Sequence, residues 1–577
     1  MGPSGCGKTT LLNVLAGRPT NASSSVGGGA VLVNGATPSR SDFRRISCFV
    51  EQEDALIGSL TVRETLLFTS RLASSSSSLP AAERLARVDA LLAAFGLEDQ
   101  ADTIVGTPIR KGISGGQKRR VGVASQLITS PRILFLDEPT SGLDSAASFE
   151  VVSYLRRVAK RSNLVVIASI HQPSSSTFNL FDKLLLLSAG RTHYFGPVDG
   201  VVPYYESLGM PVPPQVNPAE HVLELVNTDF VRDKREAAAR LEAMRAAWDE
   251  SAPAKDLRVA VADVRRHGDG ITFAAAAATA AATVVVVGEA ETKPNLASLV
   301  VTLLHRGFVK SYRDVVAYGI RFAMYTGLAL MMGTVWVRLS TDQSSIIPLT
   351  NAIFFGGAFM SFMAVAYVPA FLEDRSQYVK EHHNGLYGAT ALLVSNFLLG
   401  LPYLFLIALV FSAISYWLSN FRPAADAFFV WVLWLFLDLL AAESLVVLFT
   451  SLFPSFVVSL ALVAFANGLW MSVNGFMVSP AILNAFYRYV FHYWDYQKYV
   501  FEGMMRNEFA ERTYTCGDAC RCMFQTPLAG ECKIAGQGVL DTYGYTEDHF
   551  ARNVGIMLAI IAGYRLAAWA VLKLKKN

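Results

Sequence analysis

Charged residues are scarce in this sequence. Asp, Glu, Lys and Arg make up only 17% of its 577 residues, whereas apolar residues make up 52%. A soluble protein carries more charge and fewer apolar residues, so this composition favours a chain that is partly embedded in a membrane. The net charge is only +3, and this near balance does not indicate a nucleic-acid partner.

A signal peptide and regular cysteine pairs are also missing. The first residues contain no basic segment followed by a short apolar core, so we expect no cleaved leader. Of six cysteines, Cys6 and Cys48 lie in the charged half of the chain. The other four share one short loop without regular C-x₂-C spacing, which weakens the case for zinc. If that loop is extracellular, disulfides are favoured, with three internal pairings possible among Cys516, Cys520, Cys522 and Cys532.

Long apolar runs are confined to the second half. Six stretches approach or exceed the roughly 20 residues that a bilayer-spanning helix needs. They are residues 316–337, 347–371, 390–416, 427–452, 456–478 and 554–572. The basic tail KLKKN, and Arg375 with Lys380 between the second and third runs, place both termini in the cytosol by the positive-inside rule. The loop 479–553, with the four cysteines, is then external.

The opening residues match the phosphate-binding pattern G-x-x-x-x-G-K-[ST]. Glycines in such a loop let backbone N–H groups converge on phosphate oxygens, and a helix follows, here expected at 10–17. The lysine adds a positive charge toward the terminal phosphates, and the threonine hydroxyl is a ligand for Mg²⁺. The candidate ATP-binding residues are Gly2, Pro3, Ser4, Gly5, Cys6, Gly7, Lys8, Thr9 and Thr10.

A second segment, RILFLDEPTSGLD, reads as a short buried strand, Ile133 to Leu136, that runs into Asp137 and Glu138. A carboxylate at such a position can hold Mg²⁺, and a second carboxylate beside it can polarise the attacking water.

A third segment, ISGGQKRR, predicts another anion-binding turn at a helix N-terminus. One nucleotide does not need two such turns from the same subunit. The economical interpretation is that this turn serves a nucleotide held by a partner subunit. Its residues are Ser114, Gly115, Gly116 and Gln117.

Together these motifs resemble the ATP-binding cassette (ABC) family, whose signature is an L-S-G-G-Q-type motif. Further family motifs occur in the family's order: Gln52 matches the Q-loop glutamine, Asp144 the D-loop, and His171, after a strand expected at Leu164 to Ser169, the switch histidine. The resemblance implies that ATP and Mg²⁺ are the cofactors.

The resemblance also implies a role for each residue. The metal ligands would be Thr9, Gln52 and Asp137. Glu138 would be the general base, His171 would sense the γ-phosphate, and Ser114 and Gly116 would reach the partner's ATP. The reaction would be in-line attack of water on ATP.

The order of the two halves resembles subfamily G, the white-type half-transporters. NPAE at 217–220, LPY at 401–403 and HYWDYQKYVFEGMMRNEF at 492–509 support this resemblance. The expected fold is an α/β P-loop ATPase domain at 1–230, followed by an all-α six-helix transmembrane domain at 295–577. Between them, 231–294 is expected to be a linker, with a solvated helix at 232–250 and low complexity at 271–290.

The pattern of residues 294–314 predicts an amphipathic helix. In the family such a helix lies on the cytosolic membrane surface. The alternative interpretation is that this stretch is only the entrance to the first span.

The family also normally carries, before the phosphate loop, a strand and an aromatic residue that stacks on adenine. Because neither precedes Gly2, we expect Met1 to be an internal methionine of a longer product.

Three ionisable residues lie inside predicted spans, where they should face protein or water: Arg321, Asp438 and Glu443. Arg321 and Glu443 could pair in a network that couples the ATP state to the pore.

By resemblance, the substrate lies between subunits against the second and fifth spans. Candidate lining residues, alternatively plain packing residues, are Phe359, Phe362, Asn467 and Met471.

The sequence therefore predicts a half-transporter that dimerises, as a homodimer or heterodimer, and exports a hydrophobic or amphipathic small molecule, such as a lipid, sterol or drug, from the plasma membrane. The alternative is an ATP-binding regulatory subunit with little or no turnover. A soluble ABC ATPase is excluded by the six apolar runs.

Overall fold

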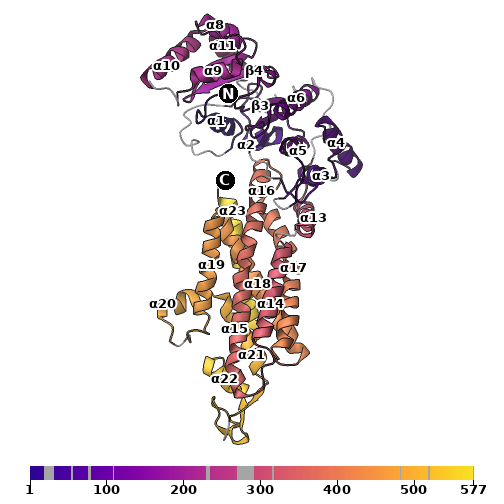
Figure 1. Ribbon diagram of the computed structural model, residues 1–577, viewed down its shortest axis with the longest axis vertical. Coiled ribbons are helices and arrows are strands. Elements are labelled where there is room, and N and C mark those ends of the chain that lie inside the picture. Colours follow the sequence, from indigo (N-terminus) through magenta and orange to yellow (C-terminus); the bar gives the residue numbers. More distant parts are fainter. Residues whose placement is uncertain are drawn as a thin grey trace. The chain divides into compact units, whose positions relative to one another are not determined.

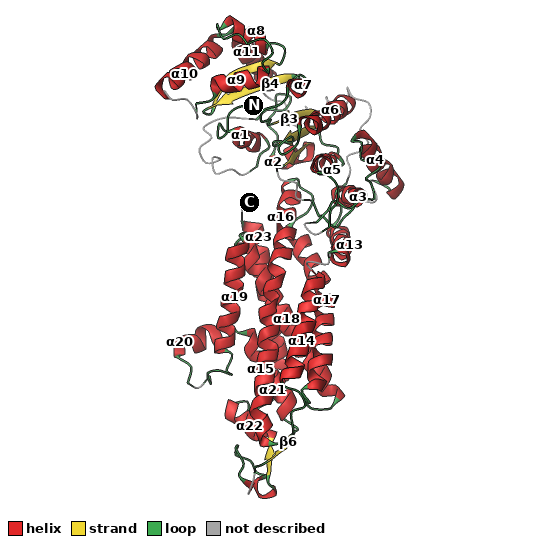
Figure 2. Cartoon of the chain, viewed as in Figure 1, coloured by secondary structure: helices red, strands yellow, loops and turns green. Residues whose placement is uncertain are grey.

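The computed structural model describes residues 1–18, 31–52, 56–75, 79–107, 110–228, 234–268, 292–314, 318–480, 482–517 and 520–575. It divides into two compact units (Figures 1 and 2). The ATPase unit comprises residues 1–302 and 379–387. The membrane unit comprises residues 303–378 and 388–576. The low-complexity stretch 271–290 lies outside the described residues.

A three-stranded parallel sheet, in the order β1-β2-β3, lies at the centre of the ATPase unit. Its strands are β1 (Ser47–Val50), β2 (Ile133–Leu136) and β3 (Val165–Ala168). Side chains alternate along each strand, so Cys48 and Val50 enter one apolar cluster while Phe49 enters another on the opposite face. Both faces are therefore covered, as is usual for parallel sheets.

Helices pack on both faces of this sheet. The larger cluster joins it to four helices, α3 (Val62–Ala73), α4 (Ala81–Ala94), α5 (Gly115–Leu127) and α6 (Ser145–Ser162). The smaller cluster joins Phe49 and Phe135 to α1 (Lys8–Leu15) and α2 (Arg40–Ile46) through Leu12 and Phe43. The strand expected at Ile133 to Leu136 is confirmed, whereas the helix expected at 10–17 begins two residues earlier, at Lys8.

An antiparallel hairpin, β4 (Lys183–Ser188) with β5 (Arg191–Pro197), forms the second layer of the ATPase unit. Met1 lies beside β4: its amino group donates to Leu185 O at 2.7 Å, and Leu187 N donates to Met1 O at 2.9 Å. The helices around the hairpin are α7 (Ser175–Phe178), α8 (Val201–Ser207), α9 (Pro218–Val226), α10 (Lys234–Glu250) and α11 (Ala252–Gly268).

The expected linker at 231–294 is partly wrong, because α10 and α11 belong to the ATPase unit. Ala237, Met244 and Trp248 lie on one face of α10 and are buried. Trp248 packs against Tyr194 and Tyr204 of the hairpin layer, with ring centroids 5.6 and 5.8 Å apart. Most of the charged residues of this helix are exposed, whereas Arg240, Arg245 and Asp249 are half-buried.

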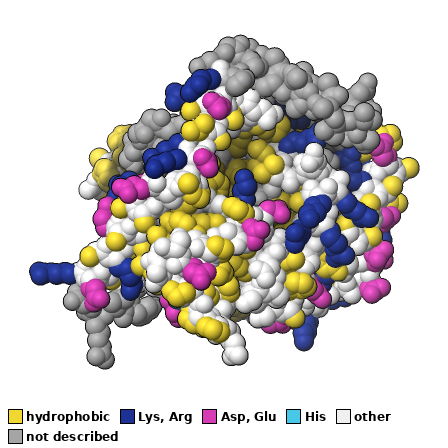
Figure 3. Space-filling model, turned by 90° about the horizontal axis from the view of Figure 1, so that it is seen from above, with side chains coloured by type: hydrophobic (Ala, Val, Ile, Leu, Met, Phe, Trp, Pro, Cys, Tyr) yellow, Lys and Arg dark blue, Asp and Glu magenta, His cyan; other side chains and the backbone are white. Residues whose placement is uncertain are grey.

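Figure 3 shows one face of the molecule, with Lys and Arg side chains interspersed among Asp and Glu. Several Lys and Arg side chains gather on the right of this view, with Asp and Glu side chains beside them.

The membrane unit is a helical bundle around α18 (Ala425–Leu452), which packs against five other helices. They are α15 (Ile346–Met363), α17 (Ala389–Leu418), α19 (Phe456–Val473), α21 (Tyr496–Phe509) and α23 (Phe550–Leu574). The amphipathic stretch forms helix α13 (Leu296–Arg313), followed by α14 (Ile320–Val335). Five helical stretches of the described chain are long and apolar enough to span a membrane.

Two predicted spans and the predicted external loop differ from the helices of the structure. The first, at 316–337, is the 16-residue helix α14, which is shorter than a full crossing. The second continues beyond 371, because polar helix α16 (Val368–His383) extends the helical stretch that begins at Gln343. The loop predicted at 479–553 contains the buried helix α21, whose apolar residues alternate with polar ones and give no long apolar run.

The remaining elements of loop 479–553 are short. They are α20 (Ala485–Tyr487), η4 (Arg488–His492), the hairpin β6 (Thr513–Thr515) with β7 (Lys533–Ala535), η6 (Ala529–Glu531) and α22 (Gly536–Tyr543). Disulfides Cys516–Cys522 and Cys520–Cys532 both form within this loop. The expected disulfides therefore form, in one of the three possible internal pairings.

Candidate functional site

The phosphate loop depends on two glycines in left-handed conformations. Gly5 has φ 73° and Gly7 has φ 99°, and nothing lies within 4 Å of the Cβ that either position would carry. Backbone conformation, rather than crowding, therefore requires glycine here. Gly7 is also the N-cap of α1, so the first N–H groups of that helix face the loop and can bind an anion.

Lys8 supplies the charge inside this loop. Its ammonium group donates to the carbonyls of Gly2 at 2.9 Å and Pro3 at 2.8 Å, and the side chain is buried. The loop's own backbone thus holds the cation at the concave surface where phosphate oxygens would bind.

The opposite wall is the carboxyl edge of the parallel sheet. Gln52 follows β1, Asp137 and Glu138 follow β2, and Ser169 follows β3. Because parallel strands end at the same edge, these side chains meet although their positions in the sequence are far apart.

Asp137 is the best-supported metal ligand. Its Oδ1 accepts hydrogen bonds from Thr9 Oγ1 at 3.2 Å and from Ser169 Oγ at 2.6 Å, and the side chain is buried. Hydroxyl and carboxylate oxygens suit Mg²⁺, which binds to few protein groups and completes its shell with water and phosphate. Among the described residues, no group of three His, Cys, Asp or Glu side chains forms a separate metal site.

Glu138 is fixed through its backbone and its carboxylate. It has a left-handed φ of 46°, which is unusual for a residue other than glycine. Its N–H donates to Ser169 Oγ at 2.8 Å, and its Oε2 accepts from Gln52 Nε2 at 2.8 Å. A carboxylate held by an amide, rather than by a cation, keeps lone pairs available to orient and deprotonate water.

The signature turn lies at the start of α5. Ser114 and Gln117 form a reciprocal capping box, with Gln117 N donating to Ser114 Oγ and Ser114 N donating to Gln117 Oε1. Ser114 and Gly115 are exposed, and the capping box does not engage the backbone N–H groups of Gly115 and Gly116. The two anion-binding turns belong to different helices, α1 and α5 (Figure 1).

Two predicted residues lie at the margin of the site. Asp144 caps α6 by accepting from Ala147 N at 2.7 Å. His171 is exposed and follows β3. The expected strand at Leu164 to Ser169 is shorter than predicted, because it ends at Ala168 and leaves Ser169 free to turn toward Asp137.

Sequence reasoning missed Ser169 and Arg119. Ser169 sits two residues before His171, and the rule that functional groups follow parallel strands would have found it. Arg119, on α5, is buried and donates to the carbonyl of Gln52 at 2.5 Å. Nothing in the run KRR indicates which of its three cations is buried.

A cavity of about 260 Å³ opens beside Thr9 and Asp137 within the ATPase unit. Arg18 lies on its wall, 4.1 Å from the centre of the Phe49 ring and 2.7 Å from Glu51. Burial lowers the pKa of Arg18, and the neighbouring Glu51 opposes that shift.

The stretch 379–387 completes this side of the ATPase unit. The amide of Asn384 pairs with the backbone of Phe49, accepting from its N–H at 3.2 Å and donating to its C=O at 3.1 Å. Lys380 lies 3.5 Å from Glu51. Asn384 therefore occupies the free edge of β1 as a neighbouring strand would.

In the membrane unit, the predicted pair of Arg321 and Glu443 is confirmed at 3.0 Å, with both side chains buried. The Arg321 guanidinium also lies over the rings of Tyr367 and Tyr403. A second arginine, Arg565, donates to Ser444 and Asn396.

The four substrate candidates do not share one environment. Phe359 is half-buried and stacks on Phe355, and Phe362 and Met471 are half-buried too. Asn467, in contrast, is fully buried and accepts from Tyr496 at 2.7 Å. Its amide is occupied inside the bundle and does not line an open cleft in this subunit.

Known proteins match along the whole chain. A family profile described as ABC transporter matches residues 1–141, and two described as ABC-2 type transporter match 171–268 and 298–509. ABC transporter G family member 11 of Arabidopsis thaliana is 33% identical over 100% of this chain and 81% of that relative.

Two further relatives match at similar levels. G family member 1 of Petunia hybrida is 34% identical over 88% of this chain and 78% of that relative. G family member 13 of A. thaliana is 33% identical over 100% of this chain and 86% of that relative. The first profile covers the phosphate loop, the signature turn and the Asp137–Glu138 pair.

Proposed function

The chain belongs to the ABC transporter G family, whose ATPase couples ATP hydrolysis to transport, and we propose that it forms one half of a dimeric exporter. The substrate class we propose is a hydrophobic or amphipathic small molecule, such as a lipid, sterol or drug-like compound. The proposed location is the plasma membrane, with the ATPase unit and both termini in the cytosol.

The observation that carries the dimer is the exposed signature turn. Ser114 and Gly115 present an anion-binding helix start on α5, while the phosphate loop of the same chain already has its own on α1. A second copy, or a related half-transporter, supplies each turn with the nucleotide it would bind.

In this proposal, Thr9, Asp137 and Gln52 would hold Mg²⁺ with ATP, and a bound ion would supply charge neutralisation for the transferred phosphoryl group. Glu138 accepts the proton of the attacking water. His171 contacts the γ-phosphate, and Asp144 lies at the subunit boundary. Gly5, Gly7 and Lys8 bind the phosphates through backbone N–H groups and the ammonium group.

The aromatic stack of the membrane unit supports an apolar substrate. Trp336, Phe355 and Phe359 stack in sequence, with centroids 6.1 and 5.6 Å apart. Flat aromatic faces that are partly exposed suit flat apolar molecules. Phe362 and Met471 extend this proposed lining.

The test is ATP hydrolysis by the full chain in lipid, compared with Glu138→Gln. We expect Glu138→Gln to lose at least about 100-fold in kcat while still binding ATP, because the base is removed and the phosphate loop is intact. Glu150→Gln, an exposed glutamate on α6, is the matched control and should retain activity.

The two functional interpretations predict different results. Vanadate-sensitive turnover that lipids or drugs stimulate, and that Glu138→Gln abolishes, supports the exporter. Equal and negligible turnover in both forms, with ATP bound tightly, contradicts it and supports a regulatory partner of a heterodimer.

A further inference from the structure

Asp438, in the middle of α18, is a fully buried carboxyl group without a cationic partner. No Lys, Arg or His nitrogen lies within 4 Å of it in the described chain, whereas Glu443, five residues further along the same helix, pairs with Arg321. An ionised carboxylate that is buried and unpaired is costly. Asp438 therefore needs either a proton or a bound cation.

Its contact with Ser361 of α15 favours the proton. Both carboxyl oxygens lie 2.7 Å from Ser361 Oγ. The serine hydroxyl carries one hydrogen and cannot donate it fully to both oxygens. A neutral carboxyl group resolves this, because its own O–H donates to Ser361 Oγ while the serine donates to the other carboxyl oxygen.

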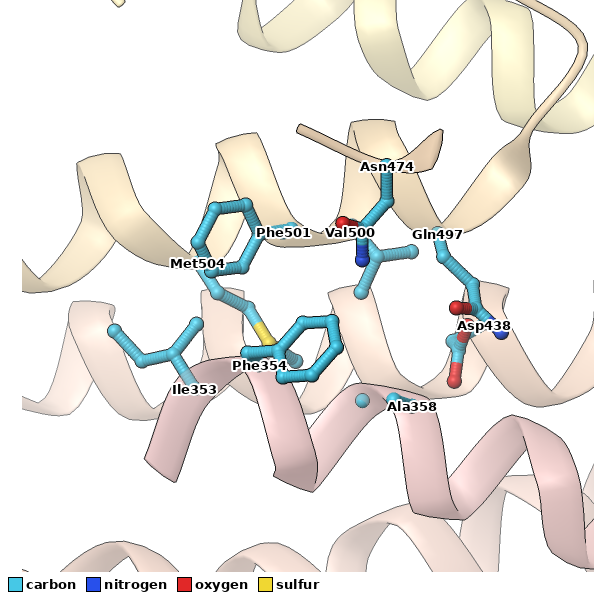
Figure 4. Close-up of a pocket in the computed structure, with 10 residues that line it drawn as sticks. Ile353, Phe354, Ala358, Asp438, Asn474, Gln497, Val500, Phe501 and Met504 are labelled. Carbon is cyan, nitrogen blue, oxygen red and sulfur yellow. The ribbon is translucent and has the colours of Figure 1, made fainter. Parts of the chain in front are cut away.

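The carboxyl group borders a small cavity between α15, α18 and α21 (Figure 4). The cavity has a volume of about 10 Å³, which is close to the minimum for one water molecule. Gln497 of α21 is 3% exposed and lines the same cavity, with its amide end directed toward Asp438 in Figure 4.

Neither the oxygen nor the nitrogen of the Gln497 amide has a hydrogen-bond partner among the described residues. A water molecule would satisfy both atoms, because it can donate to the oxygen and accept from the nitrogen. A bare metal ion would bind the oxygen only and would leave the buried NH₂ group unpaired.

The charged and titratable groups around α18 agree with a neutral Asp438. Helices α15 and α19 contribute none. At the start of α21, Asp495 and Tyr496 interact electrostatically with Asp438, and Lys498 interacts with Asp495. Burial raises the pKa of Asp495 well above its usual value.

The remaining cations near α18 are engaged elsewhere. Arg565 of α23 donates to Ser444 and Asn396, and Arg321 of α14 pairs with Glu443. Tyr564 of α23, Tyr367 and Tyr403 supply no positive charge. Two carboxyl groups, those of Asp438 and Asp495, therefore share this part of the bundle, and no described cation forms an ion pair with either.

We propose that the cavity between α15, α18 and α21 is a proton-binding site, in which Asp438 carries a proton and one water molecule bridges it to Gln497. Loss of the proton would leave an unpaired charge where three helices meet, so the site links the packing of these helices to pH.

The first test is infrared spectroscopy of the full chain in lipid. We expect carboxylic-acid C=O absorption at neutral pH that shifts in D₂O; Asp438→Asn should remove one component of it, which Asp495→Asn should retain. Glu443→Gln is the matched control and should keep the band, because Glu443 pairs with Arg321 and lies outside the proposed site. Ser361→Ala should keep the band but shift its frequency, which provides a readout if Asp438→Asn does not fold.

The second test is thermal unfolding across pH and salt. The amide that Asp438→Asn introduces does not titrate, so this variant should become more stable than wild type as pH rises through the pH at which Asp438 ionises. Replacing Na⁺ by choline should change neither Tm. An unchanged band in Asp438→Asn, or a Tm of wild type that depends on Na⁺, overturns the proposal; the latter indicates a metal-cation site.

Discussion

At the scale of single residues, Ser169 joins the two carboxylates of the ATP site. Its hydroxyl donates to Asp137 Oδ1 and accepts from Glu138 N–H, so one oxygen orients both the proposed metal ligand and the backbone of the proposed base. The left-handed φ of Glu138 is unfavourable for this residue and depends on such support. Ser169 is thus a positioning residue.

Ser169→Ala should lower kcat by about 10- to 100-fold, because a buried hydrogen bond worth about 1–3 kcal/mol is lost at both partners. The Mg²⁺ concentration needed for half-maximal activity should rise as well, which a general loss of stability would not cause. Ser175→Ala, an exposed serine on α7, is the control. An unchanged Mg²⁺ requirement would argue against the positioning role.

At the scale of elements, the hairpin β4–β5 contains a histidine that does not tolerate charge. His193 is buried, and burial lowers its pKa, although a hydrogen bond to the Ser188 backbone opposes the shift. A base with a lowered folded-state pKa favours the neutral form in the native protein. As the pH falls, the histidine of the unfolded protein binds a proton before that of the folded protein. The free energy of unfolding therefore decreases below the unfolded-state pKa.

We therefore expect the amides of β4 and β5 to lose protection against hydrogen exchange, after correction for intrinsic rates, as the pH falls below about 6.5. His193→Gln has no titratable ring and should lose less protection over the same range. Wild type and His193→Gln should differ least at about pH 8, where the histidine is neutral in both states. Parallel curves for the two proteins would show that His193 does not carry the effect.

The same scale shows what sequence patterns can predict. The strand Ile133 to Leu136 was predictable, because a short apolar run that ends in Asp-Glu indicates a buried strand. Helix α13 was predictable, because its apolar residues repeat every 3.6 residues. Helix α10 was predicted as solvated, because the buried face made by Met244 and Trp248 depends on a hairpin much earlier in the chain. Helix α21 was missed because polar residues interrupt its apolar ones and leave no long apolar run.

At the scale of the whole molecule, the ATP site that we propose requires two chains. The motif residues could be located from the sequence because each motif binds phosphate or metal through local geometry. The contacts of Ser169, Arg119 and Asn384 could not, because they depend on which strands become neighbours. The pairing of the four loop cysteines likewise depended on the fold of β6 and β7.

Mixing two inactive variants tests this composite site. Lys8→Ala damages the phosphate loop and Ser114→Arg blocks the signature turn, so each homodimer should be inactive. A mixed dimer contains one intact site, made of the loop from one chain and the turn from the other. Tandem affinity purification selects the mixed dimers, each of which has one good site of two, so about half of wild-type activity should return.

The measurement is ATPase activity after co-expression and tandem affinity purification of both tagged variants. Mixing the separately purified variants, without subunit exchange, is the control. If Lys8→Ala and Ser114→Arg chains stay inactive together, each chain uses its own two turns, and the dimer proposal fails.

The return of residues 379–387 to the ATPase unit has a practical consequence. Asn384 pairs with Phe49 on the open side of β1, so the edge of the sheet is closed by a segment that follows the first two apolar helices. A fragment that stops at Thr302 would leave that edge unpaired, and an unpaired edge strand recruits other chains. The ATPase unit therefore cannot be separated by cutting the polypeptide once. A stable fragment would need another segment that pairs with the open edge of β1 in place of residues 379–387.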